Sequence, residues 1–243
     1  MAKETAPRGS STAADACNTC RLRDLCFPGG LSTAELGLFE GIVRHRPPLR
    51  RDEVLYRAGD PFISIFVVRS GALESYHVSA TGDREVDRFS LPGHVLGWNA
   101  INGERYPNSA VALDTSSVCE IPFARLASLM LRVPMLQRKV LRVMSRAITA
   151  DHESLSVLAK RTAEERLAML LVNLSESFQD LGYSAHRFRL PMTRTDLANH
   201  LGLVPETMSR LFGRFRDRGW IVAVGSEVVL RDLAALRQAA SGS

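Results

Sequence analysis

Three of the chain's four cysteines lie close together, at Cys17, Cys20 and Cys26, and the fourth, Cys119, lies far downstream. Thiolates are preferred ligands of soft metal centres, namely zinc, copper(I) and iron–sulfur clusters. One short loop can place three thiolates around such a centre, and a thiolate from a folded domain can complete the set. We therefore expect these four side chains to meet at a metal site, although Cys119 is remote in the sequence.

The same cysteines allow two other interpretations. Four reduced thiols can form a structural zinc site, which would make the chain a zinc- or thiol-stabilised module that acts through protein contacts. Alternatively, Cys119 could be a buried core residue beside an idle loop. Zinc sites with four thiolates usually use two C-x2-C pairs, and this sequence has only the pair formed by Cys17 and Cys20. Three thiolates in a loop with a remote fourth fit a cluster better, but the residues alone leave the choice open.

Composition argues against several other classes. The chain has 243 residues, of which 45% are hydrophobic, so one large or two small domains with a full core are expected. No apolar run approaches the roughly 18 residues that a membrane helix needs, and the N-terminus lacks the apolar stretch of a secretory signal. We expect a cytoplasmic protein without membrane contact, in which thiols stay reduced. No P-loop, G-x-S-x-G or H-E-x-x-H motif is present, so an enzyme is not expected.

The N-terminal half divides into a leader, a cysteine loop and a strand-rich domain. Residues 1–15 are rich in Ala, Ser, Thr, Gly and Pro and are expected to form a disordered leader. The cysteine loop occupies 16–30. Over 31–133, a capping box at Ser32 predicts a short helix, and short apolar runs then alternate with turn signals. This pattern predicts an antiparallel β-roll, whose last strand carries Cys119.

A long helix is expected over 134–160, because this segment contains no Gly and no Pro after its first residue. Six of its residues are spaced 3, 4, 3, 4 and 3 apart, a heptad pattern that favours pairing with the same helix of a second subunit. These seam residues are Leu141, Met144, Ile148, Asp151, Leu155 and Leu158. A second stripe would pack on the chain's own domain, and it consists of Val140, Val143 and Ala147. Asp151 interrupts the seam, where a carboxylate costs stability and can act as a switch, unless the helices splay and leave it solvated.

The C-terminal segment, 161–243, has the pattern of a winged helix-turn-helix. We expect, in order, an amphipathic helix over 162–181, a short strand over 189–192, a helix capped at 193, a Gly-containing turn, a second helix over 206–218 and a hairpin over 221–230. Between residues 187 and 218 there are seven Arg and three acidic residues. Such basic clustering is typical of DNA-binding surfaces, whereas an ordinary helical hairpin with a solvated face is the alternative.

The first turn of the second helix favours DNA binding over that alternative. Recognition helices present their N-terminal residues to base edges. Arg pairs with guanine, Glu can accept a hydrogen bond from cytosine, and Ser is adaptable. The expected base-contacting residues are Glu206, Ser209 and Arg210, and the expected phosphate-contacting residues are Arg194, Thr207 and Arg214.

Together these parts resemble the CRP–FNR family of bacterial transcription regulators, and most closely its FNR (fumarate and nitrate reduction) branch. The resemblance covers nearly the whole chain from Cys17. It rests on C-x2-C-x5-C at 17–26, V-C-E-I-P-F around Cys119, A-E-E-R-L at 163–167, F-R-L-P-M-T-R at 188–194 and E-T-M-S-R-L-F-G-R-F at 206–215. The implied fold is α+β, with a β-roll sensor domain, a dimerisation helix and a winged helix-turn-helix.

The resemblance also implies a function. The four cysteines would hold an oxygen-labile [4Fe–4S] cluster, and oxidation would abolish dimerisation and DNA binding. Glu206, Ser209 and Arg210 would read half-sites like TTGAT in an inverted repeat. The chain would then be an activator of anaerobic gene expression whose partners are duplex DNA, RNA polymerase and a second copy of itself. A family member that answers a different effector is the alternative.

Three features depart from the family's pattern. Cyclic-nucleotide readers carry an Arg-Ser or Arg-Ala pair in a phosphate cassette, but the corresponding stretch here is Pro107-Asn108-Ser109-Ala110. The pairing Arg is absent, so no cyclic nucleotide is expected. Arg21 and Arg23 place two cations beside the thiols, and positive charge favours thiolates. Pro205 lacks a side chain that could touch a base, which leaves recognition at that position in question.

Overall fold

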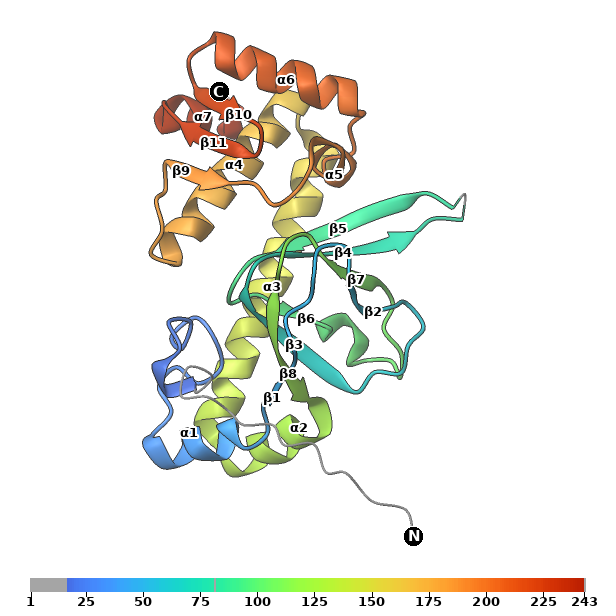
Figure 1. The fold of residues 1–243 in the computed structure, drawn as a ribbon, viewed down its shortest axis with the longest axis vertical. Coiled ribbons are helices and arrows are strands. Elements are labelled where there is room, and N and C mark those ends of the chain that lie inside the picture. The colour runs from blue at the N-terminus through green and yellow to red at the C-terminus, as the bar shows by residue number, and fades with distance from the viewer. Residues whose placement is uncertain (1–16, 81, 243) are drawn as a thin grey trace.

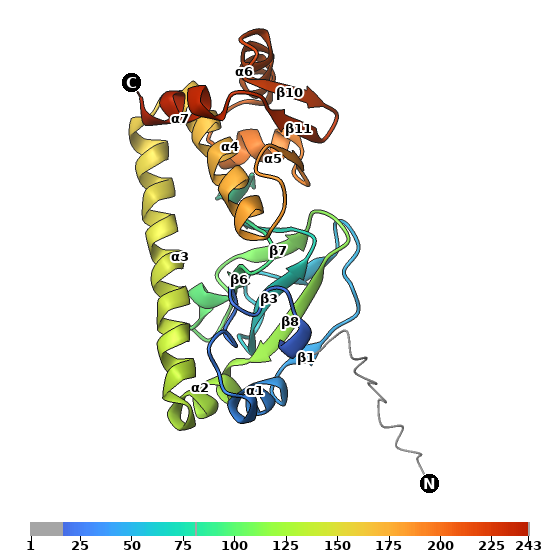
Figure 2. The same ribbon diagram turned by 90° about the vertical axis from the view of Figure 1, so that its left-hand side faces the viewer.

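The computed structural model describes residues 17–80 and 82–242, and over 150–160 it describes the backbone alone. Figures 1 and 2 show a strand-rich N-terminal domain, a long helix that runs along it, and a small C-terminal domain of helices and short strands. The predicted α+β architecture is confirmed. None of the described helices is long and apolar enough to cross a membrane.

Two four-stranded antiparallel sheets form the N-terminal domain. One has the strand order β1-β8-β3-β6 and the other has the order β2-β7-β4-β5. The strands are β1 (Arg44–His45), β2 (Val54–Tyr56), β3 (Ser64–Ser70), β4 (Leu73–Val78), β5 (Arg84–Ser90), β6 (Val95–Leu96), β7 (Ser109–Ala112) and β8 (Ser117–Pro122). The predicted antiparallel roll is therefore confirmed.

Aromatic side chains fill the interior of this roll. The rings of Tyr56 and Tyr106 are stacked with centroids 4.1 Å apart, and Phe66 stacks on Tyr56 at 5.8 Å. All three residues are buried. The Tyr106 hydroxyl accepts a hydrogen bond from the Ser64 N–H at 3.3 Å and donates one to the Ser64 carbonyl at 2.6 Å. The polar end of the ring is thereby satisfied, as a buried tyrosine requires.

Three helices surround the end of the roll that carries the cysteine loop. They are α1 (Thr33–Glu40), α2 (Phe123–Arg132) and α3 (Pro134–Lys160). The capping box predicted at Ser32 is confirmed, because its side chain accepts from the Glu35 N–H and the Glu35 carboxylate accepts from the Ser32 N–H. Pro134 opens α3 in the first turn, where no N–H is needed. Figure 2 shows α3 running from this end of the molecule to the C-terminal domain.

The C-terminal domain is a winged helix-turn-helix, as predicted. Its elements are α4 (Ala163–Asp180), β9 (Arg187–Arg189), α5 (Arg194–His200), α6 (Pro205–Asp217), β10 (Ile221–Val224), β11 (Glu227–Leu230) and α7 (Leu233–Ser241). The strand predicted over 189–192 is wrong in position, because the structure places it at Arg187–Arg189. The pairing of β9 with β11 ends where Arg189 faces Glu227, two residues before Pro191, which has no N–H to donate to a sheet.

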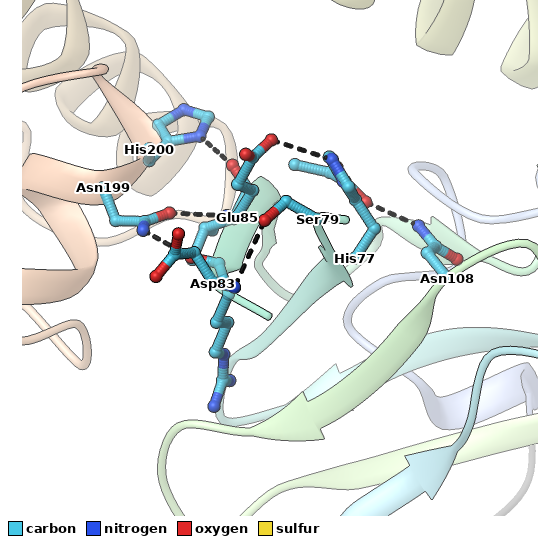
Figure 3. A network of polar contacts seen from close by, with 10 residues as sticks. His77, Ser79, Asp83, Glu85, Asn108, Asn199 and His200 are labelled. Atoms are coloured by element: carbon cyan, nitrogen blue, oxygen red, sulfur yellow. Dashed lines mark hydrogen bonds and ion pairs between the residues drawn. The ribbon is translucent and has the colours of Figure 1, made fainter. Parts of the chain in front are cut away.

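The C-terminal domain packs on the free edge of the second sheet, as Figure 3 shows. Strand β5 is the edge strand. The Asn199 side chain of α5 accepts from the Val86 N–H at 2.6 Å and donates to the Arg84 carbonyl at 2.6 Å. His200 Nδ1 lies 3.3 Å from the Val86 carbonyl. Side chains of α5 thus bind the backbone groups of β5 that would otherwise pair with another strand at an exposed edge.

A second polar group lies on the same hairpin of β4 and β5 (Figure 3). His77 Nδ1 is 2.7 Å from Asp87 Oδ1, and His77 Nε2 is 2.9 Å from Glu85 Oε2. Asn108 donates to the other Asp87 oxygen at 2.9 Å. The hydrogen bond with Asp87 and the charges of both carboxylates raise the pKa of His77. These contacts hold β5 from the side of the roll, while Asn199 holds its free edge.

Candidate metal centre and nucleic-acid interface

The four cysteines line one cavity of about 30 Å³. Cys17 lies in a 3-10 turn, Cys17–Thr19, and Cys20 and Cys26 follow it in the cysteine loop. Cys119 comes from β8 of the roll. The remaining walls are formed by Leu22, Arg23, Pro28, Phe39, Val43, Val67, Val68, Arg69 and Ile121. The structure brings the four predicted ligands to one place, and the metal itself stays a prediction.

Successive tight turns fold the cysteine loop onto itself. The Cys20 N–H donates to the Cys17 carbonyl at 3.3 Å, and the Cys26 N–H donates to the Leu22 carbonyl at 2.8 Å. Directly after them, the Phe27 side chain is fully buried. Its ring meets Trp98 edge-on at 5.7 Å between centroids. The turns gather three thiols within a short stretch, and Phe27 fixes that stretch to the apolar core.

Polar contacts connect the loop to the neighbouring helices. Lys139 Nζ of α3 donates to the Asp24 carbonyl at 2.8 Å, and the Asn18 N–H donates to Glu40 Oε1 of α1 at 3.1 Å. Gly29 lies so close to this contact that an added Cβ would be 2.9 Å from Lys139 Nζ and 3.0 Å from the Arg23 carbonyl. The loop therefore touches the long helix directly, through a side chain that carries a charge.

Cys119 is held more firmly than the other three thiols. Its strand, β8, lies between β1 and β3, and Cys119 is paired with His45 on one side and Val67 on the other. Ile121 lines the same cavity, as the alternation of side chains along a strand requires. One ligand is thus fixed by a sheet, while the others belong to a loop.

Burial controls the acidity of these thiols. It raises the pKa of Cys17 to about 12, and it also raises the pKa of Cys26. The negative charge of a neighbouring Cys119 thiolate would also raise the pKa of both thiols. The cation that lowers the pKa of Cys17 is Arg69, whereas the Arg23 guanidinium donates to Asn18 Oδ1 and to the Leu31 carbonyl. Burial thus outweighs the charge of Arg69 at Cys17, so a metal would have to displace thiol protons. The thiolate-favouring effect expected of Arg21 and Arg23 stays a prediction.

The four thiols are chemically suited to a soft metal, because they meet in a mainly apolar pocket. Within the described residues, no three Cys, His, Asp or Glu side chains are placed to hold one ion. The cavity volume of about 30 Å³ corresponds to roughly two water molecules. Admitting a group larger than one ion therefore requires movement, and the loop can move more easily than the paired strand β8.

The residues of the predicted dimer seam of α3 differ in how far they are exposed to solvent. Leu141 and Ile148 are exposed by 57% and 55% in the single chain. Met144 is half-buried and packs against the core of the roll, and Val140, from the second stripe, is buried. The side chains of Asp151, Leu155 and Leu158 lie outside the described residues. The described part of α3 thus presents an apolar face that the single chain does not cover.

Helix α6 presents its first turn to solvent. Glu206, Ser209 and Arg210, the predicted base-contacting residues, are exposed. The opposite face of the helix is buried in the core of the domain, and it consists of Met208, Leu211, Phe212 and Phe215. Pro205 occupies the first helical position. This arrangement leaves the N-terminal turn free to enter a DNA groove, in the manner of recognition helices.

The predicted phosphate-contacting residues have different surroundings. Thr207 is half-buried in α6. The Arg194 guanidinium lies over the Phe212 ring, 3.2 Å from its centroid, and burial together with the charge of Arg216 lowers the pKa of Arg194 to about 10. Arg214 is exposed but forms an ion pair with Glu164 of α4 at 2.8 Å. None of these contacts was foreseen from the sequence.

Three residues with structural roles at these sites escaped the sequence analysis. Lys139 gives no signal, because a single lysine on a helix is usually a solvated charge. Asn199 lies in a predicted helix, and nothing local indicates its distant partner on β5. Glu164 falls within the A-E-E-R-L segment, but that pattern does not indicate its partners in α6.

Comparisons with known proteins agree with this organisation. Residues 165–239 match a Crp-like helix-turn-helix domain, and residues 47–133 match a cyclic nucleotide-binding domain. The solved structure of FixK2 from Bradyrhizobium japonicum is similar, with a TM-score of 0.74, 26% identity, and coverage of 81% of this chain and 96% of that one.

Whole-length similarity extends to named regulators. The chain is 43% identical to the transcriptional activator protein FnrA of Stutzerimonas stutzeri and 44% identical to the transcriptional activator protein anr of Pseudomonas aeruginosa, with 93% of each chain covered in both cases. It is 39% identical to the fumarate and nitrate reduction regulatory protein of Vibrio cholerae, covering 93% of this chain and 91% of that one.

Proposed function

Because this chain belongs to the CRP–FNR family of transcription regulators, in its FNR branch, we propose that it senses oxygen through a [4Fe–4S] cluster bound by Cys17, Cys20, Cys26 and Cys119. Its relatives are transcriptional activators and anaerobic regulatory proteins, so the chain is a DNA-binding, non-enzymatic regulator of anaerobic genes. The single observation that carries the proposal further is the meeting of three loop thiols and one strand thiol at one cavity. When bound, such a cluster supplies iron–thiolate bonds that oxygen can disrupt.

A single zinc ion is the second candidate for this site. The observation in its favour is the small cavity volume of about 30 Å³, which is closer to the size of one ion than to that of a cluster, although the thiols would still have to move closer together to bind it. A zinc site would make the loop a structural support instead of a sensor. Similarity to the FNR branch favours the cluster, and metal analysis distinguishes the two.

We infer that the regulated state is a dimer in the cytoplasm. Leu141 and Ile148 of α3 expose apolar surface on one face, which suits pairing with a second copy of the helix. The loop contacts the same helix through Lys139, so ordering of the loop has a direct route to the seam. The dimer would place two copies of α6 on an inverted repeat with TTGAT-like half-sites, read by Glu206, Ser209 and Arg210, and would act on RNA polymerase.

The interior of the roll supports the expectation that no cyclic nucleotide is the effector. The matched domain binds such ligands in other proteins, but here the Tyr56 and Tyr106 rings are stacked and buried in the interior. The cassette position that would pair with a phosphate is Asn108, a neutral side chain that donates to Asp87. Both features favour an effector bound at the cysteines.

Metal analysis of protein purified without oxygen tests the proposal. We expect about four iron and four sulfide per subunit, a straw-brown colour that bleaches in air, and DNA binding that is lost with the colour. Cys119→Ala should remove the anaerobic chromophore, because the strand-borne ligand is lost. Ser117→Ala, which changes the neighbouring residue on the same face of β8, serves as the control. One zinc per subunit in colourless protein, or a full cluster in Cys119→Ala, would refute the four-thiolate cluster.

A further inference from the structure

Glu164 joins α4 to the recognition helix through two arginines. Its Oε2 is 2.8 Å from Arg214 Nη1, and its other oxygen forms an ion pair with Arg218, the residue that caps the end of α6. Partial burial tends to raise the pKa of Glu164, but the hydrogen bonds from both arginines hold it below its ordinary value. The carboxylate is therefore ionised at neutral pH, and one negative charge offsets two positive charges.

This ion pair lies within the surface that DNA is expected to approach. Glu164 borders a hollow of about 690 Å³ together with Thr207, Arg214 and Arg218. Thr207 and Arg214 are the residues of α6 that we expect to contact phosphates. A protein carboxylate thus contacts the guanidinium group that we expect a phosphate oxygen of DNA to contact.

The fold has little need of this ion pair. Ion pairs at the surface contribute only about 0–1 kcal/mol to stability. The Arg214 and Arg218 side chains retain 53% and 43% exposure, and the Glu164 side chain, which is partly buried, retains 23%. The packing of α6 comes instead from its buried apolar face, which includes Leu211 and Phe215. Arg218 also lies over the Trp220 ring, 4.8 Å from its centroid. The carboxylate is therefore better explained by its effect on the charge of the surface than by its effect on folding.

We propose that Glu164 competes with DNA phosphates for Arg214 and so sets the sequence-independent part of DNA affinity. Binding of DNA exchanges the Glu164 carboxylate for a phosphate oxygen, and breaking the internal ion pair opposes that exchange. A regulator with weaker non-specific affinity is less sequestered by the many competing sites of a genome. This inference rests on DNA binding, which the family establishes, and is independent of the cluster.

Glu164→Gln is the decisive variant, because it keeps the shape of the side chain and removes its charge. Glu176→Gln is the matched control: Glu176 lies on the same helix and pairs with Arg237 of α7 at 3.2 Å, not with α6. Binding is measured on an inverted-repeat duplex and on a scrambled duplex over a range of salt concentrations. Thermal unfolding of both variants checks that the fold is retained.

For Glu164→Gln we expect about 3- to 10-fold tighter binding to both duplexes at low salt, because DNA no longer has to break the Glu164–Arg214 ion pair in each subunit. The slope of log K against log salt should become steeper by up to about 0.9 per arginine freed, or roughly 2 for a dimer. Glu176→Gln should match the wild type. Arg214→Gln should reduce the salt slope in both backgrounds. The reduction should be larger in the Glu164→Gln protein than in the wild type.

Two results would overturn the proposal. Weaker binding by Glu164→Gln with an unchanged salt slope would show that the carboxylate positions Arg214 for DNA. Unchanged affinity and slope would show that it does not compete at all. Wild type and variants are prepared and compared in the same metal state, so iron content and oxygen response can depart from the proposed function without invalidating this comparison.

Discussion

The roll meets the rest of the molecule at two places that are built differently. At the cysteine end, Phe27 packs in a buried core with residues of α1, α2 and α3, the Glu40 and Lys139 side chains add polar contacts, and the thiols face a small cavity. At the hairpin end, Asn199 pairs with the backbone of β5, and one apolar core runs from Phe89 into the C-terminal domain. The comparison indicates a movable end for sensing and a firm end for holding the DNA-binding domain.

Core continuity explains why the hairpin end is firm. Val86, Phe89 and Leu91 of the roll belong to the same buried cluster as Leu197 and Leu201 of the C-terminal domain. The Phe89 ring also meets the His200 ring at 4.9 Å between centroids. Movement here would expose apolar surface as well as break hydrogen bonds. At the cysteine end, the apolar packing is centred on Phe27, while the thiols beside it line a cavity.

Phe27→Ala should have the largest effect, because it removes the apolar anchor of the cysteine end. The cost expected for a fully buried phenylalanine is about 3–5 kcal/mol of unfolding free energy. Denaturant unfolding of the cluster-free protein measures it. Leu38→Ala, at an exposed position of α1, is the control and should cost much less. Equal costs for the two variants would mean that the loop is not anchored by this ring.

Asn199→Asp tests the hairpin end with a smaller change. The carboxylate can still accept from the Val86 N–H, but it faces the Arg84 carbonyl without a donor, at an expected cost of about 1–3 kcal/mol. Amide exchange at Val86 should accelerate. Asn173→Asp, an exposed change on α4, should leave that exchange unaltered. Unchanged protection at Val86 in Asn199→Asp would show that core packing alone holds the two domains together.

Lys139→Met should loosen the cysteine end by about 0.5–1.5 kcal/mol, because the donor to the Asp24 carbonyl is lost. Amide exchange and proteolysis within residues 18–26 should increase, while exchange at Val86 should not change. Arg138→Met, an exposed neighbour on the same helix, is the control. If protection of the loop is the same in both variants, Lys139 does not connect the loop to α3.

His77 should give the smallest effect and a defined pH dependence. The partners Asp87 and Glu85 raise its pKa above the ordinary value of 6.5 in the folded protein. The stabilisation of the hairpin is therefore fully present below pH 6.5 and is lost as pH rises through the folded pKa. Amide exchange across β5, corrected for intrinsic pH dependence, measures it. His77→Gln should remove this pH dependence, and His186→Gln should not. If the pH dependence persists in His77→Gln, another titratable group causes it.

Local chemistry made most of the fold predictable. The capping boxes at Ser32 and Thr193, the Gly-containing turn and the alternation of short strands are patterns within a few residues of each other. The four cysteines were identifiable for the same reason: a thiol has few other uses when three lie in one loop. Element bounds moved by one to three residues where Pro191 or a cap decided the end.

Long-range polar pairing was not predictable. Asn199 and Val86 are 113 residues apart, and Glu164 and Arg214 are 50 apart, so no local pattern connects them. Arg194 was predicted to face phosphates, but its stacking on Phe212 depends on how α5 crosses α6. The raised pKa of Cys17 and Cys26 was also missed, because burial, its main cause, is a property of the folded loop.

The stacked tyrosines of the roll have a consequence for chemical inhibition. A planar compound could enter this part of the interior only by expelling the Tyr106 ring from its contact with Tyr56 and breaking both hydrogen bonds of its hydroxyl with Ser64. Its binding energy would be spent largely on that displacement.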